Sequence, residues 1–108
     1  RLFAMRPILH LCLHLIVPLW IARRFYAANW LFTFFVLVAT MIIDVDHLLA
    51  DPIYDPNRCG LGFHPLHSFP AIGVYGLLLI PNMTRTLGVG LWTHIILDGL
   101  DCVAINMP

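Results

Sequence analysis

Lysine and glutamate are absent from this chain, and charged residues of every kind make up only 11% of its 108 residues. Hydrophobic residues make up 60%. A small soluble domain buries a limited fraction of its surface and needs a polar exterior, which so few polar residues cannot supply. The composition therefore excludes an ordinary soluble domain and predicts one integral membrane domain over residues 1–108. The formal net charge of zero excludes a general attraction to nucleic acid.

Cysteine is also scarce, with Cys12, Cys59 and Cys102 as the whole complement. Their spacing matches no paired zinc-finger pattern, and an odd number cannot all pair within one chain. We expect Cys12 and Cys102 to be small buried hydrophobic residues. A bridge between Cys59 and Cys102 stays open as an alternative, if that end of the protein faces an oxidising compartment.

Four apolar stretches follow one another, at about 8–22, 29–50, 68–81 and 86–106. Each has roughly 15 to 22 residues, close to the ~20 that a helix needs to cross a hydrocarbon core. Ser68 is a suitable N-cap for the third stretch, with Pro70 in its first turn. The sequence predicts an all-α membrane protein, an up-down-up-down bundle of four helices. The proline- and glycine-rich loop 51–68 would cap one end.

Histidine and aspartate gather in four places along the chain, at 10–14, 44–47, 64–67 and 94–101. In an up-down-up-down bundle all four places lie at the same end of the helices. Within the helices these residues recur three or four positions apart, and residues at that interval share a face. Ionisable groups are expensive in apolar segments, so a convergent set of them indicates a functional site.

Imidazole and carboxylate groups together suit zinc, manganese or iron. We predict a site for two or more divalent transition-metal ions, most reasonably zinc. Its predicted ligands are His10, His14, Asp44, His47, His64, His67, His94 and Asp98. Asp46 and Asp101 are the candidates for a general base or for orienting a ligand histidine. Arg58 is a candidate clamp for a substrate phosphate, or a hydrogen-bonding residue of the loop. Asp51 and Asp55 we interpret as turn residues.

The opposite end of the predicted bundle carries arginines beside aromatic residues. This set resembles an interfacial belt and comprises Arg23, Arg24, Arg85, Trp20, Tyr26 and Trp30. The Arg23-Arg24 pair in a very short connection favours the cytoplasm for this end. The metal site would then face the periplasm.

Several motifs together resemble a group of small bacterial inner-membrane proteins regarded as membrane-bound metal-dependent hydrolases. They are H-x3-H at 10–14, DVDHLLADP at 44–52, RCGLGFHPLHS at 58–68 and HIILDGLD at 94–101. That group is distantly similar to the zinc-dependent phospholipase C and P1 nuclease class, helical enzymes with a trinuclear zinc site. The H-x3-D pair of that class is matched here by His94 and Asp98. The resemblance implies a metal-dependent hydrolase of the bacterial inner membrane.

We therefore expect a membrane-embedded hydrolase whose substrate is a phosphoester of a lipid or its headgroup. Membrane lipid is the expected partner, with a second copy of the chain or a larger membrane complex as further partners. One alternative is a metal-binding or metal-transport protein with the same ligands and no turnover. A second is a b-type haem protein, although the aspartates would crowd a haem pocket with charge. A third is a non-catalytic subunit of a membrane assembly.

Overall fold

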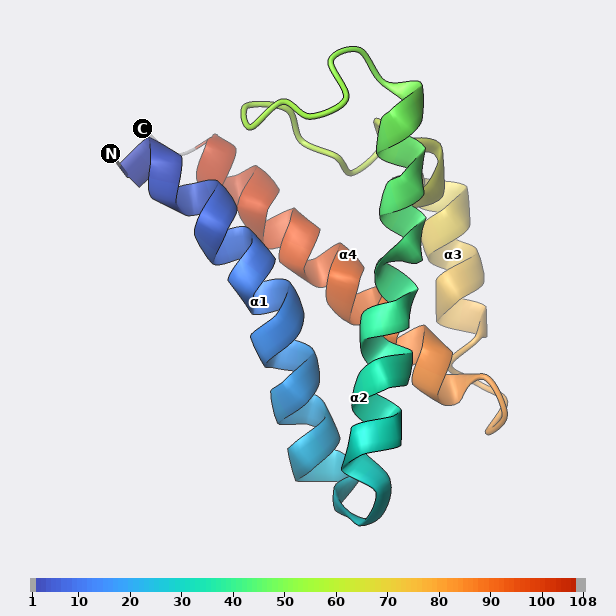
Figure 1. Cartoon of the computed structure of the whole chain (residues 1–108). Coiled ribbons are helices and arrows are strands. Elements are labelled where there is room, and N and C mark those ends of the chain that lie inside the picture. The colour runs from blue at the N-terminus through green and yellow to red at the C-terminus, as the bar shows by residue number, and fades with distance from the viewer. Residues whose placement is uncertain (1, 107–108) are drawn as a thin grey trace.

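The computed structural model describes residues 2–106, and all the secondary-structure elements in that range are helices (Figure 1). In chain order they are α1 Leu2–Phe25, the 3₁₀ helix η1 Ala27–Asn29, α2 Trp30–Ala39, the 3₁₀ helix η2 Thr40–Leu49, the 3₁₀ helix η3 Pro65–His67, α3 Phe69–Leu77 and α4 Arg85–Ile105. No strand occurs within residues 2–106. The all-α prediction is confirmed.

The first helix begins at Leu2, earlier than the start near residue 8 that the apolar pattern predicted. Two prolines, Pro7 and Pro18, therefore lie inside α1. Each proline removes a backbone donor, and the helix nevertheless continues through both positions. The helix ends at Phe25, directly after Arg23 and Arg24 in its last turn. Basic side chains there complement the partial negative charge of the helix C-terminus.

The second predicted helix changes its winding at Thr40, where α2 passes into η2. The Thr40 hydroxyl donates a hydrogen bond to the Leu37 carbonyl oxygen at 2.5 Å. A 3₁₀ helix has three residues per turn, so residues three apart lie directly above one another. Asp44 and His47 are related in this way and present their side chains on one side of η2. A 3₁₀ stretch of ten residues is long, and such stretches often mark functional segments.

The third helix is shorter than predicted. Ser68 is its N-cap, accepting a hydrogen bond from the Ala71 amide, and a proline occupies the first turn, as the sequence predicted. The helix has nine residues, or about 14 Å of length, which cannot cross a membrane alone. Three segments are long and apolar enough to do so, Met5–Phe25, Ala27–Leu49 and Arg85–Ile105. The bundle with four crossings stays a prediction.

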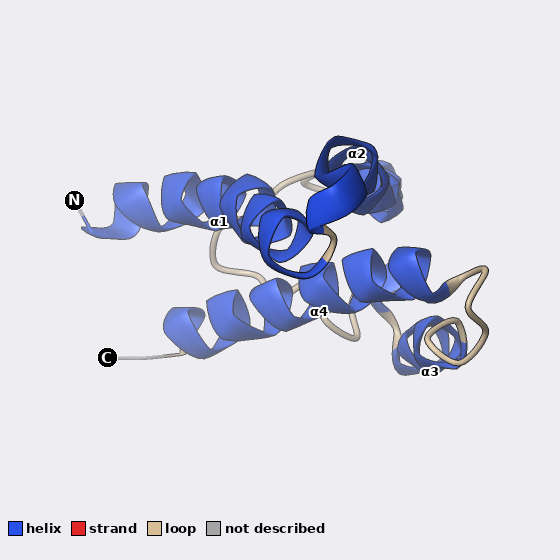
Figure 2. Ribbon diagram, turned by 90° about the horizontal axis from the view of Figure 1, so that it is seen from below, coloured by secondary structure: helices blue, strands red, loops and turns tan. Residues whose placement is uncertain are grey.

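The central element is α4, which contacts α1, α2 and η2 on one side and α3 on the other (Figure 2). At the crossing with α2, a Cβ on Gly90 would lie only 2.8 Å from Thr40 and 3.2 Å from the Leu37 Cα atom. Any larger residue would push these helices apart. Ile43, Tyr75, Leu91 and Ile95 form the buried apolar cluster that joins η2, α3 and α4.

The loop 51–68 lies across the end of the molecule where the chain termini are found (Figure 1). A disulfide between Cys59 and Cys102 joins it to α4. The expectation that Cys102 is a buried hydrophobic residue is therefore wrong, because the loop brings Cys59 within 4.9 Å of it, Cα to Cα. Cys12 is free but exposed, so its predicted burial is also wrong. An apolar outer face of α1 accommodates a thiol as readily as a core does.

Candidate metal centre

All six histidines and three of the aspartates meet below the loop, between α1, η2, η3 and α4. Their nitrogen and oxygen atoms fall into three groups, within each of which the atoms lie no more than 4.8 Å apart. We call them the central group (Asp44, His67, His94, Asp98), the α1 group (His10, His14, Asp98) and the loop group (Asp46, His47, His64). All eight predicted ligands belong to one of these groups.

The central group draws two imidazoles and two carboxylates from three elements. His94 Nε2 lies 3.0 Å from Asp44 Oδ1, and His67 Nε2 lies 3.0 Å from Asp98 Oδ2. The two Nε2 atoms are themselves only 3.3 Å apart. His67 is 0% and His94 2% exposed, so the group is closed to solvent on the helix side. Two nitrogens and two oxygens facing one point form a donor set suited to tetrahedral zinc.

The α1 group shares Asp98 with the central group. Asp98 Oδ1 lies 3.0 Å from His10 Nε2 and 3.4 Å from His14 Nε2, while Oδ2 faces His67 and His94. His14 donates from Nδ1 to the His10 carbonyl oxygen at 2.8 Å, which leaves its Nε2 lone pair directed at the group. One carboxylate thus presents a different oxygen to each of two donor groups, the arrangement of a bridging ligand.

The loop group lies beside the central one. The rings of His47 and His64 are stacked at 4.0 Å, and His47 donates from Nδ1 to the Asp44 carbonyl oxygen at 3.0 Å. Burial, followed by the charge of His47, lowers the pKa of His64, so this imidazole is held neutral and able to donate a lone pair. Asp46 Oδ1 is buried and makes no hydrogen bond among the described atoms, although His47 Nδ1 lies 3.3 Å from it. A buried carboxylate oxygen of this kind needs a cation or a donor to offset its lost hydration.

Asp46 also links the loop to the central group. Its Oδ2 accepts hydrogen bonds from the Leu66 amide at 2.8 Å and from His67 Nδ1 at 2.9 Å. The second bond fixes the His67 ring so that Nε2 points into the central group. Metal-ligating histidines usually make such a bond with their other nitrogen.

The charge at the site favours a cation. Burial by itself lowers the pKa of His67, but hydrogen bonds with Asp44, Asp98 and Asp46 outweigh it and raise the pKa to about 10. Without a metal, the His67 proton therefore supplies positive charge among these carboxylates. A metal ion at the same place would displace that proton and take over its role.

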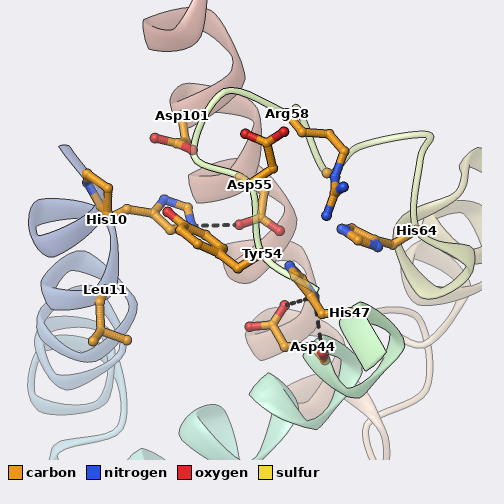
Figure 3. A pocket seen from close by; sticks show the side chains of 12 residues that line it. His10, Leu11, Asp44, His47, Tyr54, Asp55, Arg58, His64 and Asp101 are labelled. Carbon is orange, nitrogen blue, oxygen red and sulfur yellow. Dashed lines mark hydrogen bonds and ion pairs between the residues drawn. The ribbon is translucent and has the colours of Figure 1, made fainter. Parts of the chain in front are cut away.

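A cavity of about 340 Å³ opens above the three groups and under the loop (Figure 3). Arg58 lines it, with Nη2 donating to the carbonyl oxygens of Pro52 at 2.9 Å and Ile53 at 3.3 Å. Its guanidinium also lies 4.6 Å from the Phe63 ring centre. Arg58 is thus a hydrogen-bonding residue of the loop that also lines the cavity, and its role as a phosphate clamp stays a prediction.

Two further aspartates line this cavity without joining a donor group. Asp101 Oδ1 accepts from Arg6 Nη1 at 2.6 Å, and Arg6 also bonds the Pro56 carbonyl oxygen. Asp101 therefore contacts an arginine and not a ligand histidine. Asp55 Oδ1 accepts from the Asn57 amide at 2.9 Å, which confirms its interpretation as a turn residue.

Two residues at the site were not predicted from the sequence: Arg6, which pairs with Asp101, and Tyr54, which lines the cavity. Arg6 precedes His10 by four positions on the same helix, which was a readable signal. Tyr54 lies in an irregular loop, where no periodicity predicts the direction of a side chain.

A model of a family of unknown function (DUF6122) matches residues 4–105, and the chain belongs to this family. No curated protein and no solved structure matches the chain.

Proposed function

We propose that this chain is a membrane-embedded metal-dependent hydrolase that acts on a phosphoester of a lipid or its headgroup. The observation that carries the proposal is the position of Asp98, whose two carboxylate oxygens face two separate groups of histidines at 3.0–3.4 Å. A carboxylate that presents one oxygen to each of two donor groups can bridge two neighbouring metal ions. Paired metal ions recur in enzymes that hydrolyse phosphoesters.

The residues present fit two or more transition-metal ions, with zinc as our choice. The donors are histidine nitrogens and carboxylate oxygens, and Asp46 Oδ1 is a buried oxygen without a hydrogen bond that a cation would satisfy. The α1 and central groups would hold one ion each, with Asp98 between them. The loop group could hold a third. When bound, such ions lower the pKa of water and stabilise the negative charge of phosphoryl oxygens.

The chain's own residues would then bind and orient the substrate. Arg58 would hold a phosphoryl oxygen from the loop side of the cavity, since a guanidinium forms paired hydrogen bonds with phosphate. Asp46 would keep His67 in the tautomer that directs Nε2 at the central group. Asp101 forms an ion pair with Arg6, so its role would be to hold the Arg6 side chain in place. A role for Asp101 as general base is supported only by its position in the wall of the cavity. In the reaction a water oxygen bonds to phosphorus, the ester P–O bond breaks, and the water proton passes to the leaving oxygen.

The setting we propose is the bacterial inner membrane, with the site on the periplasmic face. Three candidate spans support a membrane location. The Cys59–Cys102 disulfide lies at the end that holds the site, and disulfides persist in oxidising compartments such as the periplasm. Arg23 and Arg24 lie at the other end, and the excess of basic residues in cytoplasmic loops supports a cytoplasmic location for that end.

Elemental analysis of detergent-purified protein, prepared without chelator, tests the metal. We expect two or more equivalents of a transition metal per chain, since nine donor residues form three groups. Less than about half an equivalent would contradict the proposal, because buried carboxylates in such number would then be satisfied without a cation.

Hydrolysis is tested separately, by chelating the metal, reloading with zinc, and assaying phosphomonoesters and phosphodiesters before and after. We expect activity to be lost and regained with the metal, and to be lost in Asp98→Asn. Full metal with no hydrolysis would instead support a metal-binding or metal-transport protein, or a structural subunit acting with a second copy or a larger complex. A Soret band in the purified protein would support haem.

A further inference from the structure

The walls of the cavity differ in chemistry. The donor residues form its floor, and Asp55 and Arg58 of the loop lie above them, while Tyr54 extends from the loop in the direction of His10 (Figure 3). On the α1 side, Pro7 and Leu11 line it next to His10. The Arg58 guanidinium can therefore meet a phosphate on the loop side, next to the carboxylate of Asp55, while Pro7 and Leu11 meet apolar groups on the α1 side.

Leu11 also belongs to the outer surface of the protein. Its side chain is 57% exposed although it lines the cavity. The exposed face of α1 around it is apolar and includes Met5, Ile8, Leu9, Leu15 and Ile16. All of them lie in the candidate span Met5–Phe25. The α1 side of the cavity is therefore continuous with a surface that would face acyl chains in a membrane.

The size of the cavity limits what it can enclose. Its volume of about 340 Å³ lies at the lower end of the ~300–1,000 Å³ that is usual for small-molecule pockets. This is room for a phosphate headgroup but not for a pair of long acyl chains as well. A lipid bound here must leave its chains outside the cavity.

We infer that the substrate is a long-chain phospholipid that enters sideways from the membrane, with its phosphate between Arg58 and the donor groups and its chains passing over Leu11 and Pro7. Leu11 is then a specificity-determining residue that favours substrates with chains. This inference rests on the proposed hydrolase function and names its substrate class. It differs from entry through the aqueous face, where a soluble phosphoester would serve equally well.

The test compares Leu11→Asn with Leu9→Asn. The two leucines are 57% and 59% exposed on the same helix, but only Leu11 lines the cavity. The probes are phosphatidic acid with two palmitoyl chains and the water-soluble dibutyryl form. We expect Leu11→Asn to reduce the ratio of kcat/KM for the long-chain over the short-chain probe about tenfold, as loss of part of a leucine contact predicts. Leu9→Asn should leave the ratio unchanged. An equal ratio in both variants would overturn the inference while leaving the hydrolase function intact.

A second measurement does not depend on turnover. Phosphatidic acid with a diazirine near the start of one chain should label α1 around Leu11 in the wild-type protein, and inorganic phosphate should compete with the labelling. Both effects should be weaker in Leu11→Asn and retained in Leu9→Asn. Labelling that phosphate does not reduce would reflect lipid around the protein and would contradict the inference, whatever the outcome of the hydrolysis assay.

Discussion

The two ends of the long helices differ in how they hold charge. At the ligand end, defined by the three donor groups, His67, His94 and Asp46 are 0–3% exposed. At the arginine end, defined by Arg23, Arg24 and the turn after α1, both guanidinium groups are exposed and each lies over an aromatic ring. Exposed charges keep their hydration, whereas buried ones must be paired or bound to a metal. Charge at the exposed arginine end therefore costs little free energy, whereas buried charge at the ligand end must be offset by partners.

The charged groups at the two ends differ in the partners that surround them. Arg23 lies 4.6 Å from the Trp30 ring centre and needs no other partner. Asp98 is met by four histidine nitrogens within 3.4 Å, supplied by α1, η3 and α4. The arginine end is a local arrangement of neighbours in sequence. The ligand end exists only through the tertiary structure.

The largest expected effect is the membrane face from which each end can be labelled, because a residue is accessible either from one face or from the other. In a Cys12→Ser background, where Cys59 and Cys102 are joined, we expect Asp55→Cys and Ala27→Cys to react with an impermeant maleimide from opposite membrane faces. The loop carries residue 55, and the connection between α1 and α2 carries residue 27. Met83→Cys, 96% exposed before α4, should react from the same face as residue 27. Reaction of residues 27 and 55 from one face would remove the distinction between the ends.

The next effect separates two aspartates that both line the cavity. Asp98→Ala should remove the shared carboxylate, reduce metal content by at least one equivalent, and destabilise the protein by roughly 3–5 kcal/mol, as loss of one partner from a buried ionic network does. Asp55→Ala removes the same group from a turn and should leave the metal unchanged. Elemental analysis and thermal unfolding in detergent measure both quantities. Full metal in Asp98→Ala together with loss in Asp55→Ala would place the site in the loop.

A smaller effect is expected from Asp46, the carboxylate bonded to His67. Asp46→Asn keeps the shape of the side chain but weakens its bond to His67 Nδ1, so zinc affinity should fall about 10- to 100-fold while the protein remains folded. Competition with a zinc-binding indicator measures the change. Asp51→Asn, the same substitution at an exposed loop position, is the control and should have no effect. Equal affinity in both variants would show that Asp46 does not orient a ligand.

The smallest effect belongs to the arginine end. Arg23→Ala removes the guanidinium from above Trp30 and should cost no more than about 1 kcal/mol of stability, the usual range for an exposed cation–π contact. Metal content should stay at the wild-type level. If this variant lost metal, the two ends would be coupled and the contrast between them would fail.

Much of the site could be predicted from the sequence because its residues recur at helical spacing in segments that return to one end. The pairing of His94 with Asp98 and of His10 with His14 follows from intervals of four, and both pairs lie in donor groups. The exact end of α3 could not be predicted, because its apolar residues continue past Leu77 to Ile80, and Pro81 limits the helix without fixing its last residue. The change to 3₁₀ winding at Thr40 was equally invisible, since it accompanies the close crossing with Gly90.

The sequence by itself determined that the protein is all-α, roughly where its helices lie and where its ionisable residues gather, because composition and periodicity are local properties. Only the tertiary structure decided that one carboxylate, Asp98, is shared by two groups of histidines, that Asp46 contacts His67, and that Cys59 lies against Cys102. Apart from His94, which is four positions from Asp98, the residues joined in these contacts are 21 to 88 positions apart. Their distances depend on helix crossings and on the path of an irregular loop, which are set by packing and not by any local pattern.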